Sequence, residues 1–256
     1  MPEITAYFWI IKGLSTAMGE STSDYLVHAM PPVLAVLLGF AGFVVGMVIQ
    51  FSMRRYVAWA YWLAVVMVGV FGTMVADVLH VGFGVPYLAA AIFFALVLAA
   101  NFTVWYLLEK TLSIHSIDTT RREVFYWLAV IATFALGTAA GDLTAITFHL
   151  GYLWSAVLFA VIMTIPAIAH ARFRLPAVLA FWFAYVNTRP LGASIADWLG
   201  KTVPEGGLGA GNGRVALILT LAIAGFVAYL AVSRRDVQLD TRQHKTARQR
   251  SGKAGY

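Results

Sequence analysis

Long apolar runs separated by short polar segments dominate the chain. A membrane-spanning helix needs about 20 mostly apolar residues, and eight runs of suitable length can be marked. They cover residues 4–25, 33–53, 57–80, 87–108, 124–148, 152–171, 176–199 and 214–232. The pattern therefore predicts an all-α polytopic membrane protein with eight transmembrane helices.

The composition supports this interpretation. Apolar residues make up 61% of the 256 residues and charged residues only 12%, whereas an average soluble domain has about 25% charged residues. This argues against a soluble enzyme, a disordered chain and a nucleic-acid-binding domain. The chain has no cysteine, so it forms neither a disulfide framework nor a thiolate metal site. Residues 1–5 do not read as the start of a signal peptide, and we expect the first helix to be retained.

The basic residues predict the orientation. Of the 18 Lys and Arg residues, 14 fall at one set of helix ends or in the segment 234–256. The opposite loops hold only Lys201 and Arg214, and Lys12 and Arg189 lie inside spans. The positive-inside rule then places both termini in the cytoplasm. The segment 234–256 is basic and nearly devoid of large apolar side chains, which predicts a disordered cytoplasmic tail.

The odd-numbered spans repeat one spacing, which is an aromatic–Trp pair, a Gly ten residues after the Trp and an Asp fifteen after it. The four sets are Trp9, Gly19, Asp24; Trp62, Gly72, Asp77; Trp127, Gly137, Asp142; and Trp182, Gly192, Asp197. The repeat predicts four parallel copies of a two-helix unit in one membrane domain. The copies cover residues 1–53, 54–110, 111–173 and 174–233. We interpret the Trp residues as packing between repeats or interfacial anchors, and the Gly residues as helix-crossing points.

Three segments carry a resemblance to a known family: Thr120-Arg121-Arg122-Glu123, Leu136-Gly137-Thr138-Ala139-Ala140-Gly141-Asp142 and Thr188-Arg189-Pro190-Leu191-Gly192-Ala193-Ser194. The chain resembles uncharacterised bacterial membrane-anchored proteins built from tandem two-helix repeats, each with a recurring tryptophan. The resemblance covers nearly the whole chain except the tail. It implies a multi-pass protein of the bacterial inner membrane, and it implies no activity.

Polar residues follow the inner face of the odd-numbered spans, because residues four apart share a helix face. The first span carries such a column along much of its length, and so does the seventh, whereas the third and fifth are polar only in their outer halves. These candidate pathway residues are Lys12, Thr16, Glu20, Asp24, Thr73, Asp77, Thr138, Asp142, Tyr185, Arg189 and Asp197. A charge at the bilayer centre costs about 3 kcal/mol. We therefore expect the odd helices inside the bundle and the even helices outside.

The same residues suggest a cation site near the outer face. Three histidines return to about the same helix faces as three of the Asp residues. The candidate metal ligands are Asp24, Asp77, Asp142, Asp197, Glu20, His28, His80 and His149. Carboxylate oxygens with imidazole nitrogens suit a divalent transition metal. Two alternatives stay open: the histidines can be interfacial loop residues, and each Asp can be a structural group paired with a neighbouring helix, Lys or Arg.

These patterns favour a transporter or channel for a small cation, above all a divalent metal ion, with proton coupling. A bound divalent metal ion is the one cofactor that they suggest, and the expected partners are lipid, the cation and further copies of the chain, with no nucleic acid. One alternative is a transporter of an organic solute or organic cation, which would use the aromatic side chains. A second alternative is an intramembrane metal-dependent enzyme, although the chain has no helical H-E-x-x-H motif or nucleophile elbow.

Overall fold

The described part of the chain is helical throughout its main elements. The computed structural model describes residues 1–53 and 55–236, so Arg54 and most of the predicted tail lie outside the described residues. The long helices are α1 (Ala6–Ala29), α2 (Pro32–Ser52), α3 (Ala58–Asp77), α4 (Tyr87–Glu109), α5 (Thr120–Asp142), α6 (Gly151–Phe173), α7 (Ala177–Gly200) and α8 (Asn212–Ser233). Short helices η1 (Val78–Gly82), η2 (Ile114–Ser116), η3 (Leu143–Thr147) and η4 (Val203–Glu205) lie between them.

Six helical stretches of the described chain are long and apolar enough to cross a membrane. They are α2, α3 with η1, α4, α5 with η3, α6 and α8. Helices α1 and α7 are 24 residues long each, but they carry ionisable residues such as Glu20 and Arg189 that lower their hydropathy. The prediction of an all-helical membrane protein is therefore confirmed.

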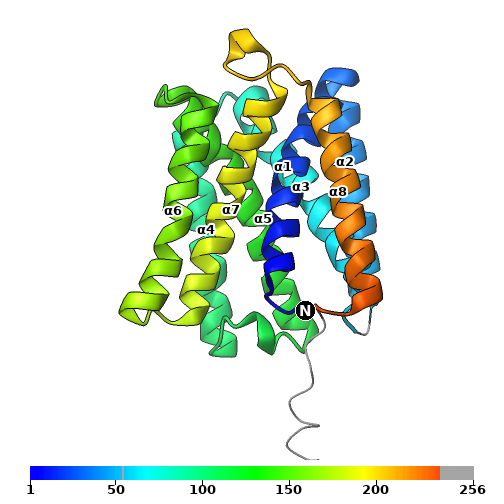
Figure 1. The fold of residues 1–256 in the computed structure, drawn as a ribbon, viewed down its shortest axis with the longest axis vertical. Coiled ribbons are helices and arrows are strands. Elements are labelled where there is room, and N and C mark those ends of the chain that lie inside the picture. Colours follow the sequence, from blue (N-terminus) through cyan, green and yellow to red (C-terminus); the bar gives the residue numbers. More distant parts are fainter. Residues whose placement is uncertain (54, 237–256) are drawn as a thin grey trace, which may run out of the picture.

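Four helices form a closed ring at the centre of the bundle. Helix α1 contacts α3, α3 contacts α5, α5 contacts α7, and α7 contacts α1 again. The outer helices pack mainly against the next inner helix around this ring: α2 against α3, α4 against α5, α6 against α7, and α8 against α1. Figure 1 shows all eight running roughly parallel to the long axis of the molecule. The two helices of each predicted repeat unit thus contact each other less than they contact the neighbouring unit around the ring.

Glycines allow the inner helices to approach closely where they cross. A Cβ added to Gly19 of α1 would lie 2.8 Å from a backbone carbon of Gly69 in α3. Added at Gly72 of α3, it would lie 2.8 Å from Phe134 in α5. The same test at the other two repeated glycines meets side chains of the next helix: Arg189 and Pro190 at Gly137, and Thr16 at Gly192. Each repeated glycine therefore faces the next inner helix around the ring.

Both described ends of the chain lie at one end of the bundle, which we call the terminal end. The backbone N–H of Glu3 donates to the carbonyl of Asp236 at 2.8 Å. The carboxylate of Asp236 is buried and accepts from the Tyr56 hydroxyl, and burial together with this carboxylate raises the pKa of Tyr56. Asp236, which the sequence placed in the disordered tail, is therefore packed against the bundle.

The opposite end, where the inner helices finish, is called the carboxylate end because Asp24, Asp77, Asp142 and Asp197 lie near it. Helices α3 and α5 pass directly into the π-helical turns η1 and η3 after Asp77 and Asp142. Helices α1 and α7 stay α-helical beyond Asp24 and Asp197. This difference divides the four Asp residues into two pairs. The pair followed by π-helical turns is of interest because such turns are rare and recur at functional sites.

Candidate functional site

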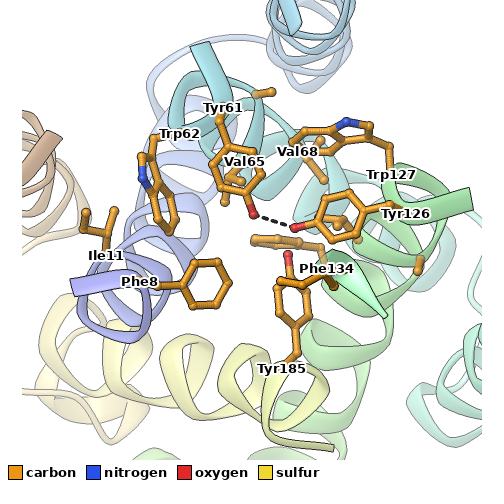
Figure 2. Packing of buried hydrophobic residues seen from close by; sticks show 14 of the residues in the cluster. Phe8, Ile11, Tyr61, Trp62, Val65, Val68, Tyr126, Trp127, Phe134 and Tyr185 are labelled. Atoms are coloured by element: carbon orange, nitrogen blue, oxygen red, sulfur yellow. Dashed lines mark hydrogen bonds between the residues drawn. The ribbon is translucent and has the colours of Figure 1, made fainter. Parts of the chain in front are cut away.

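A layer of aromatic side chains fills the centre of the ring toward the terminal end. The hydroxyl oxygens of Tyr61 and Tyr126 lie 2.5 Å apart, and the Tyr185 hydroxyl points toward them (Figure 2). Phe8 and Trp62 pack beside them with ring centroids 5.6 Å apart. These side chains are at most 1% exposed, so the layer leaves no open path along the axis.

Lys12 lies beside this layer and is completely buried. Its Nζ is 4.1 Å from the ring centroid of Tyr185 and 4.2 Å from that of Phe134. Within residues 1–53 and 55–236, it has no hydrogen-bond partner. An ammonium group between two ring faces gains cation–π attraction. Burying an amine without a hydrogen bond nevertheless costs free energy, so the position of Lys12 is unusual for a charged side chain.

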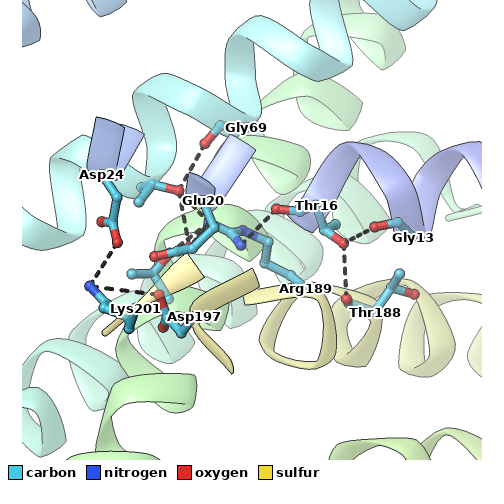
Figure 3. Close-up of polar contacts among 11 residues, drawn as sticks. Gly13, Thr16, Glu20, Asp24, Gly69, Thr188, Arg189, Asp197 and Lys201 are labelled. Carbon is cyan, nitrogen blue, oxygen red and sulfur yellow. Dashed lines mark hydrogen bonds and ion pairs between the residues drawn. The ribbon is translucent and has the colours of Figure 1, made fainter. Parts of the chain in front are cut away.

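An ion pair between α1 and α7 occupies the middle of the ring. Nη2 of Arg189 donates to Oε2 of Glu20 at 2.7 Å, and the side-chain exposures of the two residues are 0% and 4%. Nη1 of Arg189 donates to the Thr16 carbonyl at 3.2 Å. Figure 3 shows Glu20 and Arg189 meeting between their helices. A buried ion pair needs such hydrogen bonds to offset the loss of water.

Threonines of α3 and α5 complete this pair. Nη2 of Arg189 also donates to the Thr138 hydroxyl at 2.8 Å and to the Thr73 hydroxyl. The Thr138 hydroxyl lies 3.3 Å from Oε2 of Glu20 and donates to it. All four inner helices thus contribute to one connected polar cluster, which we call the central cluster: Thr16, Glu20, Thr73, Thr138 and Arg189.

A second ion-paired group lies nearer the carboxylate end. Nζ of Lys201 donates to Oδ2 of Asp24 at 2.7 Å and lies 3.7 Å from Oδ1 of Asp197. The Asn212 amide donates to the same oxygen of Asp24 at 3.0 Å. One ammonium therefore serves two carboxylates from α1 and α7 (Figure 3).

Lys201 was not among the candidate residues from the sequence, which assigned it to a loop. Burial alone lowers its pKa, but the Asp197 and Asp24 carboxylates outweigh this effect and raise the pKa above its usual value. The sequence does contain a signal for this contact, because Lys201 follows Asp197 by four residues and so continues the polar column of α7. Lys201 lies just beyond the predicted span 176–199, and for that reason the predicted column does not include it.

Asp77 and Asp142 lack such a partner. Neither side chain has a hydrogen bond or ion pair within the described part of the chain, and both are half-buried. Apart from Arg121, Arg122 and Glu123 in the first turn of α5, the inner helices and Lys201 contribute five carboxylates and three basic groups, which leaves two carboxylates in excess. The structure therefore separates the predicted quartet into a neutralised pair, Asp24 and Asp197, and an uncompensated pair, Asp77 and Asp142.

The histidines form local contacts instead of converging on the carboxylates. Nδ1 of His28 lies 2.6 Å from the carbonyl of Asp24 in its own helix. Nδ1 of His80 lies 2.8 Å from the carbonyl of Val85, and its ring stacks on Tyr87. His149 is exposed, with a φ of 57°. In the part of the chain that is described, no three His, Cys, Asp or Glu side chains are grouped to hold a metal ion, so the predicted metal site has no support.

Three of the four repeated tryptophans are buried in the bundle. Trp62, Trp127 and Trp182 are at most 5% exposed, and Trp9 is half-buried. Nε1 of Trp182 donates to the Leu112 carbonyl at 2.9 Å, and the ring of Trp182 packs edge-on against Trp105 of α4 with centroids 5.9 Å apart. These contacts place the Trp182 ring between helices, and Trp62 and Trp127 belong to the same buried hydrophobic core.

These features define a multi-pass, all-helical membrane protein with a charged centre. A family model described as Repeat of Unknown Function (DUF347) matches residues 60–111, 125–175 and 180–236 in tandem. The chain belongs to this repeat family. No curated protein and no solved structure matches the chain.

Proposed function

We propose that all eight helices cross the membrane as four two-helix copies, with both termini in the cytoplasm. The three matched stretches each run across two successive long helices. Residues 1–53 lie outside these matches, but they carry the same Trp, Gly and Asp spacing, and Gly19 contacts the next inner helix as the other repeated glycines do. The basic residues at the terminal end support the orientation.

We propose that the protein transports a small cation through the ring of inner helices, in exchange with protons. The observation that carries this proposal is the uncompensated pair Asp77 and Asp142, which lies toward the carboxylate end from the Glu20–Arg189 ion pair. A carboxylate removed from water without a partner is unstable by several kcal/mol. It therefore takes up either a proton or a cation, and competition between the two couples their movements.

In this proposal, the cation passes the central cluster on its way between the carboxylate end and the terminal end. Among the described residues, Arg189 is the one basic group that pairs with Glu20, so a cation that reaches Glu20 competes with the guanidinium. The threonine hydroxyls at Thr73 and Thr138 can hold the displaced guanidinium, because they already accept from it. In this conformation the aromatic layer around Tyr61 and Tyr126 closes the path to the terminal end. Transport would require that layer to open.

The test is a flux measurement on the full-length protein in proteoliposomes that contain a pH-sensitive dye. Pulses of NaCl, KCl, MgCl2 and MnCl2 are applied separately. We expect at least one salt to drive proton movement beyond that in empty liposomes, and we expect Asp77→Asn and Asp142→Asn to abolish it because neutral amides do not exchange protons.

The matched control is Asp118→Asn, which neutralises a carboxylate that is 71% exposed and pairs with Arg122. This variant should keep the wild-type flux. The proposal is wrong if no salt moves protons in the wild type, or if flux survives in both Asp77→Asn and Asp142→Asn. The choice between monovalent and divalent ions follows from which salt is active.

A further inference from the structure

A cavity of about 610 Å³ lies on the side of the bundle between the ends of α1 and α3 and the start of α2. Its volume is within the range of ordinary small-molecule sites, about 300–1,000 Å³. The residues that line it are Val27, His28, Pro32, Val33, Val36, Leu37, Met74, Asp77, Val78, Val81 and Gly82. Several wall residues are strongly exposed on the outside of the bundle, including Val33 at 73% and Val81 at 82%. The cavity therefore opens laterally, toward the region that lipid would occupy.

Asp77 is the only carboxylate in this wall. Its side chain makes no hydrogen bond or ion pair among the described residues, and it is directly followed by the π-helical turn η1, whose Val78, Val81 and Gly82 also line the cavity. The other ionisable side chain in the wall is that of His28, and its Nδ1 is hydrogen-bonded to the carbonyl of Asp24. An otherwise apolar cavity thus presents one carboxylate that lacks a partner among the described residues.

We propose that this cavity binds a hydrophobic organic cation, which enters from the lipid and places its charge against the carboxylate of Asp77. Apolar walls favour hydrocarbon or aromatic groups by burial. They provide no oxygen ligands to replace the water around a small hydrated ion. An anion is repelled by Asp77, and a neutral lipid chain leaves the carboxylate unpaired at a cost. This inference rests on the proposed function because Asp77 is common to both, and it adds a second class of ligand with its own route.

The probe is tetraphenylphosphonium, tested against tetraphenylborate, which has nearly the same size and shape and the opposite charge. Binding to the purified full-length protein in detergent is measured by isothermal titration calorimetry. We expect saturable binding of the cation at least about tenfold tighter than that of the anion, since one charge-assisted contact changes an equilibrium constant by about that factor.

Two variants locate the site. Asp77→Asn should weaken tetraphenylphosphonium binding about tenfold because it removes the charge, and Val36→Trp should weaken it at least as much because the indole fills the cavity. Val48→Trp is the matched control, since Val48 belongs to the same helix, is 60% exposed and does not line the cavity. This control should bind the cation within about twofold of wild type.

The result that overturns the inference is equal binding of cation and anion, or unchanged cation binding in Asp77→Asn or Val36→Trp. The proton flux of the preceding section is a separate readout. Asp77-dependent binding of tetraphenylphosphonium without any salt-driven flux in the wild type would reject the proposed transport of small cations and support the cavity site. Salt-driven flux that depends on Asp77, with binding that does not, would reject the cavity site alone.

Discussion

Single residues decide how the charges of this bundle are balanced. Lys201 is the clearest case, because its ammonium lies between the Asp24 and Asp197 carboxylates and its side chain is only 23% exposed. Without it, α1 and α7 would bring two negative charges together near the carboxylate end. Asp77 and Asp142 lack such a cation among the described residues, so the position of one lysine separates the two pairs in charge.

We predict that Lys201→Met lowers the free energy of unfolding by about 1–3 kcal/mol, less than for a fully buried pair because water still reaches the ammonium. Since the pKa of Lys201 is raised, its stabilisation is fully present below the ordinary lysine value of about 10.4 and is lost only as pH rises through the raised value. Thermal unfolding in detergent between pH 7 and pH 11 measures this. Lys201→Arg should stay close to wild type, and an equal loss in that variant would contradict an electrostatic role.

At the scale of helices, close crossings hold the ring together. The repeated glycines face the next inner helix, and Gly19 faces the backbone of Gly69 in α3. Backbone cannot move aside as a flexible side chain can. The outer helices also hold the bundle together, because each packs mainly on the inner helix of the next repeat unit around the ring.

We predict that Gly19→Ala destabilises the protein by about 1–3 kcal/mol, because the new methyl group forces α1 and α3 apart. Gly13→Ala in the same helix is the control, since a Cβ there meets nothing within 4 Å. It should be neutral or stabilising by up to about 1 kcal/mol, as alanine favours the helix over glycine. Thermal unfolding of both variants is the measurement, and equal effects would show that the crossing tolerates a methyl group.

At the scale of the whole molecule, the Glu20–Arg189 pair joins the first inner helix to the last. It lies where the ring closes between α1 and α7, and Thr73 and Thr138 bring the other two inner helices to the same point. Loss of either charge should therefore weaken the association of all four helices.

A double-mutant cycle tests this closure. Glu20→Leu and Arg189→Met should each cost about 3–5 kcal/mol, since each leaves a buried charge unpaired, and the double variant should recover a large part of the sum. The exposed pair Asp118 and Arg122 is the matched control, and its coupling should be below about 1 kcal/mol. Additive effects at Glu20 and Arg189, measured by denaturation in mixed micelles, would argue against the closure.

Helical periodicity predicted the polar faces well. The column Lys12, Thr16, Glu20 and Asp24 is buried along one face of α1, because a four-residue step is a local property of the helix. The histidines were a different case: His28 and His80 share faces with their Asp residues, yet each contacts a nearby carbonyl instead. A shared helix face fixes neither the direction in which a side chain points nor its distance from another side chain. Sequence spacing alone therefore could not establish whether these histidines and carboxylates meet.

The sequence by itself determined that the chain is an all-helical membrane protein with internal repeats and which helix faces are polar, because hydropathy and periodicity are properties of neighbouring residues. Only the tertiary structure decided which charges meet. Lys201 reaches Asp24 across 177 positions of the chain, and Asp77 lines a lateral cavity built from three helices. Such contacts depend on which helices become neighbours, and no local pattern encodes that.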